Sequence, residues 1–391
     1  MHLVNKILFF VLISFSHQVL SQQSSPFKTS AIQVEKDSSI SLHTMILWPW
    51  LDYLIDLDAP FTWDDCGVPC KLKERCRFPL SCSNHLCKEA HSYDPSPFCP
   101  SLNITAKYGC NICAVTPLNP VSNTCKLSQL MTYKGADSPF GIQFVSSCAP
   151  SSLLKSLPSY VKGVAAFSWS SLAFPRQLSF SGVADKFALC LTNDPVMSRG
   201  VIFLGDGPFY FTPYPNLDIR TILSYTPMIR KSSKSLGYYI KLNRISINGT
   251  RIHLPTLKSE SVKLSTVVAY TTLRSDIYKA LVTGFSKATK NIPRAIAESP
   301  FNLCLKASVR SVHYGFQVPN IELETESGKV WTISGDNSME RSTWNGAACL
   351  AFVDGGSRVK DAIVIGTFQM ENNFLFFSIW RIKSWVLALR Y

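Results

Sequence analysis

Thirteen cysteines constrain this 391-residue chain more than any other feature. Ten of them fall between Cys66 and Cys148, and only three follow. Cysteines at this density are typical of disulfides in an oxidising, exported setting rather than of metal sites. The ten can form five local disulfides, and Cys304 with Cys349 would make a sixth, which leaves Cys190 without an evident partner. The cysteines expected to pair are Cys66, Cys70, Cys76, Cys82, Cys87, Cys99, Cys110, Cys113, Cys125, Cys148, Cys304 and Cys349.

The first 21 residues predict a secretory signal peptide. Lys6 precedes the apolar run 7–13, and a small-residue site at 19–21 precedes a polar segment. The apolar run is too short to cross a bilayer, and no later uncharged apolar stretch reaches the roughly 18 residues that a membrane helix needs. Asn103 and Asn248 begin Asn-X-Thr glycosylation sequences, which agree with export. We therefore expect a secreted, extracellular protein with no membrane partner.

The formal net charge of +13 bears on the partners of the protein. A basic exported protein attracts polyanions, so an acidic cell-wall polysaccharide is one expected partner. A charge that serves solubility alone is the alternative. Nucleic acid is not expected as a partner, because no Lys/Arg-rich block is longer than 230–234.

The hydrophobic pattern predicts an all-β architecture with few short helices. Short apolar and aromatic runs are broken by 23 prolines and 19 glycines. Strands are expected within 40–66, 140–148, 161–169, 186–191 and 200–204. The clearest helical spacing of apolar residues runs from Ser275 to Ala288.

The remaining segments set the expected organisation. Residues 22–40 are polar and are expected to be a loose lead-in, and residues 66–125 are expected to be loops held by disulfides. A basic, serine-rich connection at 222–235 precedes a new series of strands. We therefore predict a signal peptide at 1–21, an N-terminal lobe at 22–222 and a C-terminal lobe at 223–391.

Several motifs, taken in order, give the chain a family resemblance. They include Ser147-Cys148-Ala149-Pro150, Lys186-Phe187-Ala188-Leu189-Cys190-Leu191, Ile245-Ser246-Ile247-Asn248-Gly249, Val353-Asp354-Gly355-Gly356-Ser357 and Ile363-Val364-Ile365-Gly366. The chain resembles the plant xylanase-inhibitor-like group of aspartic protease homologues, which includes extracellular dermal glycoproteins and glucanase-inhibitor-like proteins. The likeness spans 41–377. It implies a bilobal pepsin-like β fold with a cleft between the lobes, six disulfides and a location in the cell wall or apoplast.

The resemblance also places the residues of the protease centre. Aspartic proteolysis uses two carboxylates, one from each lobe, that share one proton. The first position is Asp56, in Asp56-Leu57-Asp58 where the family pattern is Asp-Thr-Gly or Asp-Ser-Gly. Counting back from Tyr278 puts the second position at Ser265. A serine hydroxyl cannot replace a carboxylate as the proton partner, so Asp56 is expected to be a degenerate catalytic acid.

Asp56 and Asp58 do not replace the lost pair. Residues at i and i+2 on a strand share a face, but their backbones lie about 6.5 Å apart, which is too far to share a proton unless the chain turns sharply. Val267, in the second glycine position, adds a steric objection to catalysis. The aromatic residue of a cleft-covering hairpin is also hard to find, and Tyr133 is the nearest candidate.

No metal or cofactor is expected. Cys110-Asn111-Ile112-Cys113 has the spacing of a redox motif or a zinc knuckle, but structural disulfides are the better interpretation in this cysteine-dense segment. Asp64 and Asp65 could bind a cation, although such a pair is usually a solvated strand end. The histidines after the signal do not form a metal-binding or Ser-His-Asp pattern.

The resemblance implies a secreted, proteolytically inactive homologue that binds and inhibits a microbial glycoside hydrolase of the endoxylanase or endoglucanase class. Inhibitory contacts of the group lie largely in second-lobe loops and the C-terminal tail. This chain ends at Tyr391, short of the usual cysteine-bearing tail, and we expect that to leave Cys190 unpaired. Two alternatives stay open: a functional aspartic endopeptidase, and a basic glycoprotein associated with the cell wall.

Overall fold

The computed structural model describes residues 30–38, 41–47, 51–67, 77–93, 99, 111–133, 144–179, 185–193, 199–210, 216–254, 260–307, 309–311, 315–342, 346–378 and 385–386. The expected signal peptide, the Asn103 acceptor and Cys70, Cys76 and Cys110 lie outside these residues. None of the helices in the described ranges is long and apolar enough to cross a membrane.

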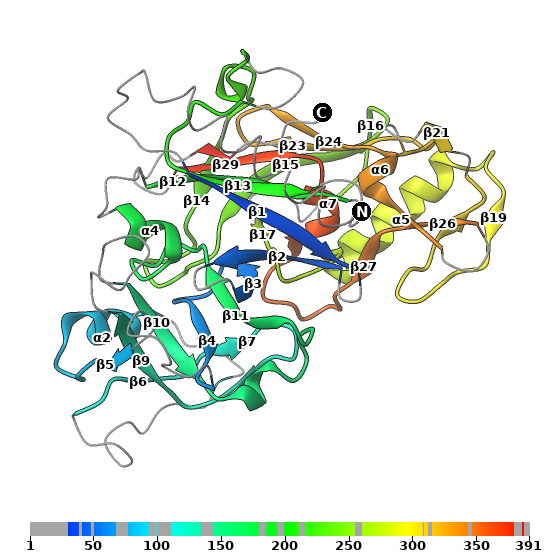
Figure 1. Ribbon diagram of the computed structural model, residues 1–391. Helices are drawn as coiled ribbons and strands as arrows, with labels where there is room; N and C mark the ends of the chain where they lie inside the picture. The colour runs from blue at the N-terminus through cyan, green and yellow to red at the C-terminus, as the bar shows by residue number, and fades with distance from the viewer. Residues whose placement is uncertain are drawn as a thin grey trace, which may run out of the picture.

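Two large β-sheets make up most of the described structure (Figure 1). The first has 12 strands in the order β29-β12-β13-β1-β2-β3-β11-β4-β10-β9-β5, with β6 paired to β9. Its strands are β1 (Ser30–Asp37), β2 (Leu42–Leu47), β3 (Leu51–Asp56), β4 (Trp63–Asp65), β5 (Arg77–Pro79), β6 (Ala114–Val115), β9 (Ser128–Tyr133), β10 (Val145–Ala149), β11 (Val161–Ala166), β12 (Lys186–Cys190), β13 (Gly200–Leu204) and β29 (Phe374–Ser378).

The second sheet has 10 described strands, seven of them in the order β24-β23-β15-β17-β28-β18-β27. Strands β14 and β16 pair with β15, and β30 pairs with β14. The strands are β14 (Thr226–Ile229), β15 (Tyr239–Ile247), β16 (Thr250–Arg251), β17 (Ser261–Leu264), β18 (Thr271–Leu273), β23 (Ile321–Thr325), β24 (Val330–Ile333), β27 (Phe352–Asp354), β28 (Ile363–Ile365) and β30 (Trp385–Val386).

Smaller elements complete the described chain. The remaining strands are β7 (Leu118–Asn119), β8 (Thr124–Cys125), β19 (Arg294–Ala295), β20 (Cys304–Leu305), β21 (Val309–Ser311), β22 (Gly315–Phe316), β25 (Met339–Arg341) and β26 (Ala348–Leu350). The helices are α2 (His85–Ala90), α4 (Phe174–Ser179), α5 (Ser275–Ala288), α6 (Gly335–Ser338) and α7 (Thr367–Met370), with short 3₁₀ turns at Ser151–Leu154 and Ile219–Thr221. The expectation of an all-β fold with few helices is confirmed.

One ladder of four strands occurs twice. Strand β11 pairs in parallel with β3 and antiparallel with β4, which pairs in parallel with β10. Strand β28 repeats this arrangement with β17 and β18, and β18 pairs in parallel with β27. In the two parallel pairs, Ile55 lies opposite Ala165 and Leu264 lies opposite Ile365. The ends of β3 and β17 therefore occupy equivalent places.

The C-terminal part of the chain returns to the first sheet. Strand β29 pairs antiparallel with β12, and the rings of Phe187 and Phe377 stack at 4.5 Å between centroids. Figure 1 shows β29 lying beside β12. Both phenylalanines are fully buried and belong to a core cluster that also contains Ile55 and Leu264. Burial of one such side chain stabilises the fold by about 1.5–3 kcal/mol, so one apolar core joins the two repeats.

The predicted helix from Ser275 to Ala288 is confirmed as α5, because its apolar residues recur at helical spacing and face the core. The loose lead-in predicted at 22–40 was wrong for its second half, which forms β1. Val34 pairs with both Gly200 and Met45 and is fully buried. Backbone pairing on two sides overrides the polar composition of this segment.

The prediction of loops alone at 66–125 was also too simple. Helix α2 forms there because the Asn84 side chain accepts a hydrogen bond from the Leu86 backbone N–H at 2.9 Å, which caps the helix. The disulfide between Cys87 and Cys113 then ties α2 to β6. A local cap and a cross-link make this short helix without a long hydrophobic repeat.

Candidate functional site

The two repeats meet where β3 and β17 end, and Thr266 joins them. Its hydroxyl donates to the Ile55 carbonyl oxygen at 2.7 Å and accepts from the Leu57 backbone N–H at 3.2 Å. Thr266 is fully buried. The equivalent position in the first repeat is Leu57, which has no hydroxyl to return these bonds. Thr266 therefore holds the turn after β3 from one side only.

Asp56 lies at the end of β3 and is 5% exposed. Its carboxylate accepts the Asp58 backbone N–H at 2.8 Å. Burial raises the pKa of Asp56 to about 6, and the negative charge of Asp58 adds to the rise. Backbone hydrogen bonds from Asp58 and Ala59 and the positive charge of Lys263 oppose it. Asp56 is therefore a buried acid that takes up a proton more readily than an ordinary aspartate.

Ser265 stands where the second repeat reaches the same point. Its backbone N–H donates to the Ile365 carbonyl oxygen at 3.0 Å, and the residue is 5% exposed. The hydroxyl accepts a long hydrogen bond of 3.4 Å from the Val267 backbone N–H. The register of β17 with β28 therefore puts Ser265 in the place equivalent to Asp56, and no carboxylate comes from that place.

A cation and an acid form an ion pair across the two motifs. The ammonium group of Lys263, on β17, contacts the carboxylate of Asp58 directly. The Lys263 side chain is 19% exposed and that of Asp58 is 40% exposed. Although burial disfavours the charged ammonium, the carboxylate of Asp58 outweighs that effect and raises the pKa of Lys263 above its usual value. Asp58 therefore has a salt-bridge partner 205 residues away in the sequence.

This arrangement differs from an acid dyad in the groups at the two equivalent positions. A dyad needs two carboxylates that compete for one proton, whereas the equivalent positions here hold one carboxyl group and one hydroxyl. The Asp58 carboxylate raises the pKa of Asp56, as a second carboxylate would, but Asp58 is itself paired with Lys263, whose charge partly opposes the rise. The site can hold a proton on Asp56, but the equivalent position of the second repeat offers the Ser265 hydroxyl where a dyad has its second carboxyl group.

The sequence did not identify Lys263 as a site residue. The available signal was its spacing, because residues two apart on a strand share one face, which puts Lys263 on the side of Ser265. Spacing alone carries no information about which acid the lysine meets, since that depends on the contact between β17 and the turn after β3. Tyr133 ends β9, and residues 134–143, where a covering hairpin would lie, are outside the described residues.

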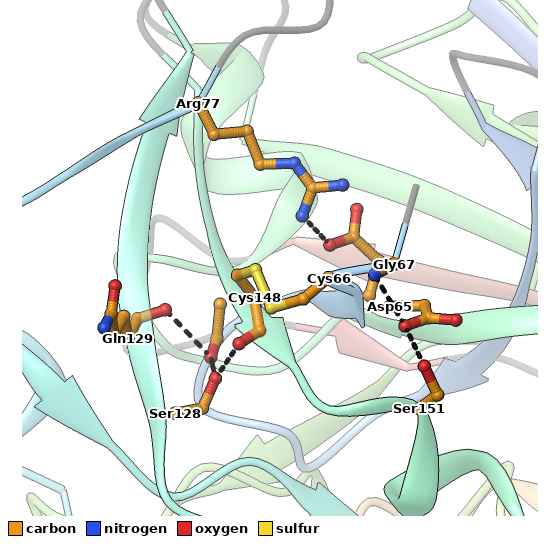
Figure 2. The surroundings of a disulfide bond; sticks show 10 residues. Asp65, Cys66, Gly67, Arg77, Ser128, Gln129, Cys148 and Ser151 are labelled. Atoms are coloured by element: carbon orange, nitrogen blue, oxygen red, sulfur yellow. Dashed lines mark hydrogen bonds and ion pairs between the residues drawn. A yellow bond between two sulfur atoms is a disulfide. The ribbon is translucent and has the colours of Figure 1, made fainter. Parts of the chain in front are cut away.

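Asp64 and Asp65 have different structural roles. Asp64 is 1% exposed, forms an ion pair with Arg77 and accepts from the Tyr53 hydroxyl at 2.9 Å. Figure 2 shows the surroundings of Asp65, which accepts from the Gly67 backbone N–H at 2.9 Å and from the Ser151 hydroxyl at 2.8 Å. These contacts orient the chain on either side of the Cys66 disulfide, so the interpretation of Asp64 as part of a solvated strand end was wrong.

Four disulfides have both cysteines in the described residues, and they join Cys66 to Cys148, Cys87 to Cys113, Cys99 to Cys125, and Cys304 to Cys349. Cys82 is also disulfide-bonded. Cys190 is a free thiol on β12, and burial raises its pKa to about 12. Its strand lies between β13 and β29.

One cluster has the residue types of a metal site. Potential ligand atoms of Cys87, His91 and Cys113 lie within 4.8 Å of one another. The two sulfurs are bonded to each other, and the His91 Nε2 atom is 2.7 Å from the Ala114 carbonyl oxygen. A disulfide has no thiolate to offer a metal, so this cluster is a structural cross-link.

A second buried ionic group lies away from the motifs. Lys36, on β1, contacts the fully buried Glu371 at 2.9 Å, and His43 lies 3.6 Å from the same carboxylate. Burial raises the pKa of Glu371 to about 8 and lowers that of His43 to about 3. Glu371 follows α7, so this group joins β1 and β2 to the segment that leads into β29.

Comparison with known proteins agrees with this geometry. The xylanase inhibitor N-terminal family model matches residues 50–206, and the xylanase inhibitor C-terminal model matches 237–381. Chitinase CLP from Oryza sativa subsp. japonica is 33% identical, over 88% of this chain and 84% of that protein. Gamma conglutin 1 from Prunus dulcis is 30% identical, over 96% of this chain and 91% of that protein.

Solved structures show the same fold. The crystal structure of edgp matches with a TM-score of 0.76 and 30% identity, covering 94% of this chain and 96% of that one. The crystal structure of basic 7S globulin from soybean matches with a TM-score of 0.73 and 25% identity, covering 93% of this chain and 95% of that one. With its two pepsin-like β repeats and its match to both family models, the chain belongs to the xylanase-inhibitor family of aspartic protease homologues.

Proposed function

We propose that this protein is a secreted, proteolytically inactive aspartic-protease homologue that binds and inhibits a microbial glycoside hydrolase of the endoxylanase or endoglucanase class. The observation that carries the loss of proteolysis is Ser265 in the position equivalent to Asp56. The ion pair between Lys263 and Asp58 adds to it, because a cation lies beside the remaining acid. Membership of the xylanase-inhibitor family supports the inhibitory role.

A proteolysis assay tests the first half of the proposal. The purified protein is incubated with an unfolded protein substrate from pH 3 to 6, with and without pepstatin. We expect no cleavage by the wild-type protein or by the Asp56→Asn variant. Pepstatin-sensitive cleavage by the wild type that is lost in Asp56→Asn would show a working endopeptidase, and the proposal of inactivity would be wrong.

An inhibition assay tests the second half. Fungal endoxylanases and endoglucanases are titrated with the protein, and their rates on soluble xylan or glucan are measured. A specific inhibitor reaches a plateau near one protein per enzyme and retains its effect at about 0.5 M salt, where exposed charges are strongly screened. Inhibition that disappears with salt indicates charge-driven association. Unchanged rates across the panel at a large excess of protein contradict the proposed role.

Chitin hydrolysis is a second candidate, raised by the rice relative named chitinase CLP. Glycoside hydrolysis uses two carboxyl groups, one of which keeps its proton near neutral pH. Asp56 has such a raised pKa, and Asp58 follows two residues later. The salt bridge to Lys263 weighs against Asp58 as a nucleophile or base. Release of reducing ends from chitin oligosaccharides, abolished by Asp56→Asn, would favour this candidate over the inhibitor.

A further inference from the structure

Four exposed cations surround the C-terminal end of α5. Lys287 is in the last turn, Lys290 follows it, Arg294 is on β19 and Lys306 follows β20. We call these four residues the α5 basic surface. Strands β19 and β20 are paired, with Arg294 opposite Leu305, and the Lys306 backbone N–H donates to the Pro293 carbonyl oxygen at 2.9 Å. Residues from three segments are thus brought to one end of the helix.

Arg294 fixes the loop after α5 against the helix. Its guanidinium group donates to the Ser286 carbonyl oxygen at 2.7 Å and to the Thr289 hydroxyl at 2.9 Å. Both acceptors are neutral, so these bonds position the guanidinium without cancelling its charge. The disulfide between Cys304 and Cys349 anchors β20 on the other side. The α5 basic surface is therefore carried on a well-braced part of the fold.

The charges of this surface are not compensated within the described residues. Some other cations of the C-terminal half have acidic partners, such as Lys231 with Asp361 and Arg244 with Glu324. The four cations of the α5 basic surface form no ion pair with a described carboxylate. Repulsion among four like charges disfavours this grouping unless another role compensates for it.

The helix dipole explains only part of the grouping. Cations near a helix C-terminus are favourable by about 0.3–1 kcal/mol each, and the effect fades within the last turn. Lys287 and Arg294 satisfy this condition, since one is in that turn and the other bonds to its carbonyl group. Lys290 follows the helix and Lys306 belongs to a different segment, so the helix dipole does not explain their placement. We therefore look for a ligand outside the chain.

The ligand should be an extended polyanion. The cations are spread over the helix end and two strands, which suits a chain of repeated negative charges better than a single small anion. A protein partner fits less well, because an interface buries about 800 Å² on each side around an apolar centre. The described loop between β19 and β20 has one large exposed apolar side chain, Ile296, which is 83% exposed. One such side chain is a small apolar centre for a protein interface.

We propose that the α5 basic surface binds an acidic polysaccharide of the polyuronate type. The carboxylates of successive sugar units would meet the lysine ammonium groups, and Arg294 would offer fixed donors beside them. Such binding would retain the protein on a polyanionic matrix. The binding needs only the cations of this surface and a polyanion, so it can be tested with no hydrolase present.

A charge-reversal experiment tests the assignment. Binding to polygalacturonate is measured at about 20 mM and 150 mM salt for the wild type and for the triple variant Lys287→Glu, Lys290→Glu, Lys306→Glu. Arg294 is left in place because it braces the loop. The matched control reverses three other exposed lysines, Lys88, Lys126 and Lys155, and changes the net charge by the same amount. Thermal unfolding of each variant checks that the fold is kept.

The proposal predicts wild-type binding that weakens with salt, a loss of about tenfold or more in the α5 variant, and a much smaller loss in the control. Equal losses in both variants would mean that overall charge, not this surface, causes binding. Wild-type protein that does not bind, or an α5 variant that binds normally, also overturns it. Polygalacturonate binding is measured with no hydrolase present, so failure of this proposal and failure of the inhibitory function are separate results.

Discussion

Replacing Asp56 with asparagine tests the electrostatics of the buried acid at the end of β3. The asparagine side chain would keep the shape of the aspartate and an oxygen that can accept the Asp58 backbone N–H, but it cannot ionise. The wild-type carboxyl has a pKa raised from 3.8 to about 6, mainly by burial. The substitution therefore removes a titration while it preserves the local hydrogen bond.

The expected effect on stability follows from the two pKa values. The folded protein binds this proton more tightly than the unfolded chain does, so the group contributes stability below the unfolded value, and this is lost as pH rises through the folded value. A rise from 3.8 to about 6, at 1.36 kcal/mol for each pKa unit, corresponds to a total of about 3 kcal/mol. We expect the stability of the Asp56→Asn variant relative to wild type to increase by about 2–3 kcal/mol between about pH 4 and pH 7.5.

Urea unfolding of both proteins across this pH range measures the difference. Other buried groups also titrate: the raised pKa of Glu371 lowers wild-type stability as pH rises, and the depressed pKa of His43 lowers it as pH falls. Both groups are present in the variant, so their effects cancel when the two free energies of unfolding are subtracted. The difference between variant and wild type therefore reports on Asp56.

Asp354→Asn is a control of opposite sign. Hydrogen bonds from the Ser275 hydroxyl and the Gly356 backbone N–H hold the pKa of Asp354 below its usual value. This variant should lose stability relative to wild type as pH rises to the unfolded value of 3.8 and stay level well above it, so its unfolding is also measured below pH 4. If the Asp56→Asn difference is the same at the acidic and neutral ends of the range, the Asp56 carboxyl does not have a raised pKa, and the reasoning is refuted.

Three further substitutions probe the same region and the free thiol. Lys263→Met should lower the free energy of unfolding in urea by about 1–2 kcal/mol, which is less than for a fully buried pair because Asp58 is 40% exposed. Adding Asp58→Asn should recover part of this loss, and an undiminished loss in the double variant would contradict a direct pairing. Thr266→Val should cost about 1–3 kcal/mol, since the buried Leu57 N–H and Ile55 carbonyl lose their hydroxyl partner, whereas Thr266→Ser should stay near wild type. Cys190 should resist iodoacetamide at mildly alkaline pH in the folded protein and react in urea, as judged by mass spectrometry; rapid native labelling would contradict the raised pKa of this half-buried thiol.

Local patterns in the sequence were enough to predict much of the fold. The apolar spacing from Ser275 to Ala288 identified α5, because a helix repeats its buried face within a few residues. The ordered motifs identified the family, and they located Asp56 and Ser265. Both residues can be placed because Asp56 ends one short buried strand and Ser265 directly follows another.

The tertiary structure decided what those positions mean. Polar residues at 30–37 form a central strand because β2 and β13 offer backbone partners on both sides. Lys263 meets Asp58, and Thr266 meets the turn after β3, across more than 200 residues of sequence. The burial of Asp56 and the positive charge of Lys263 near it depend on long-range contacts, whereas the negative charge of Asp58 comes from a neighbour along the chain. The sequence by itself determined which side chains stand at the ends of β3 and β17; only folding brought the cation to the acid.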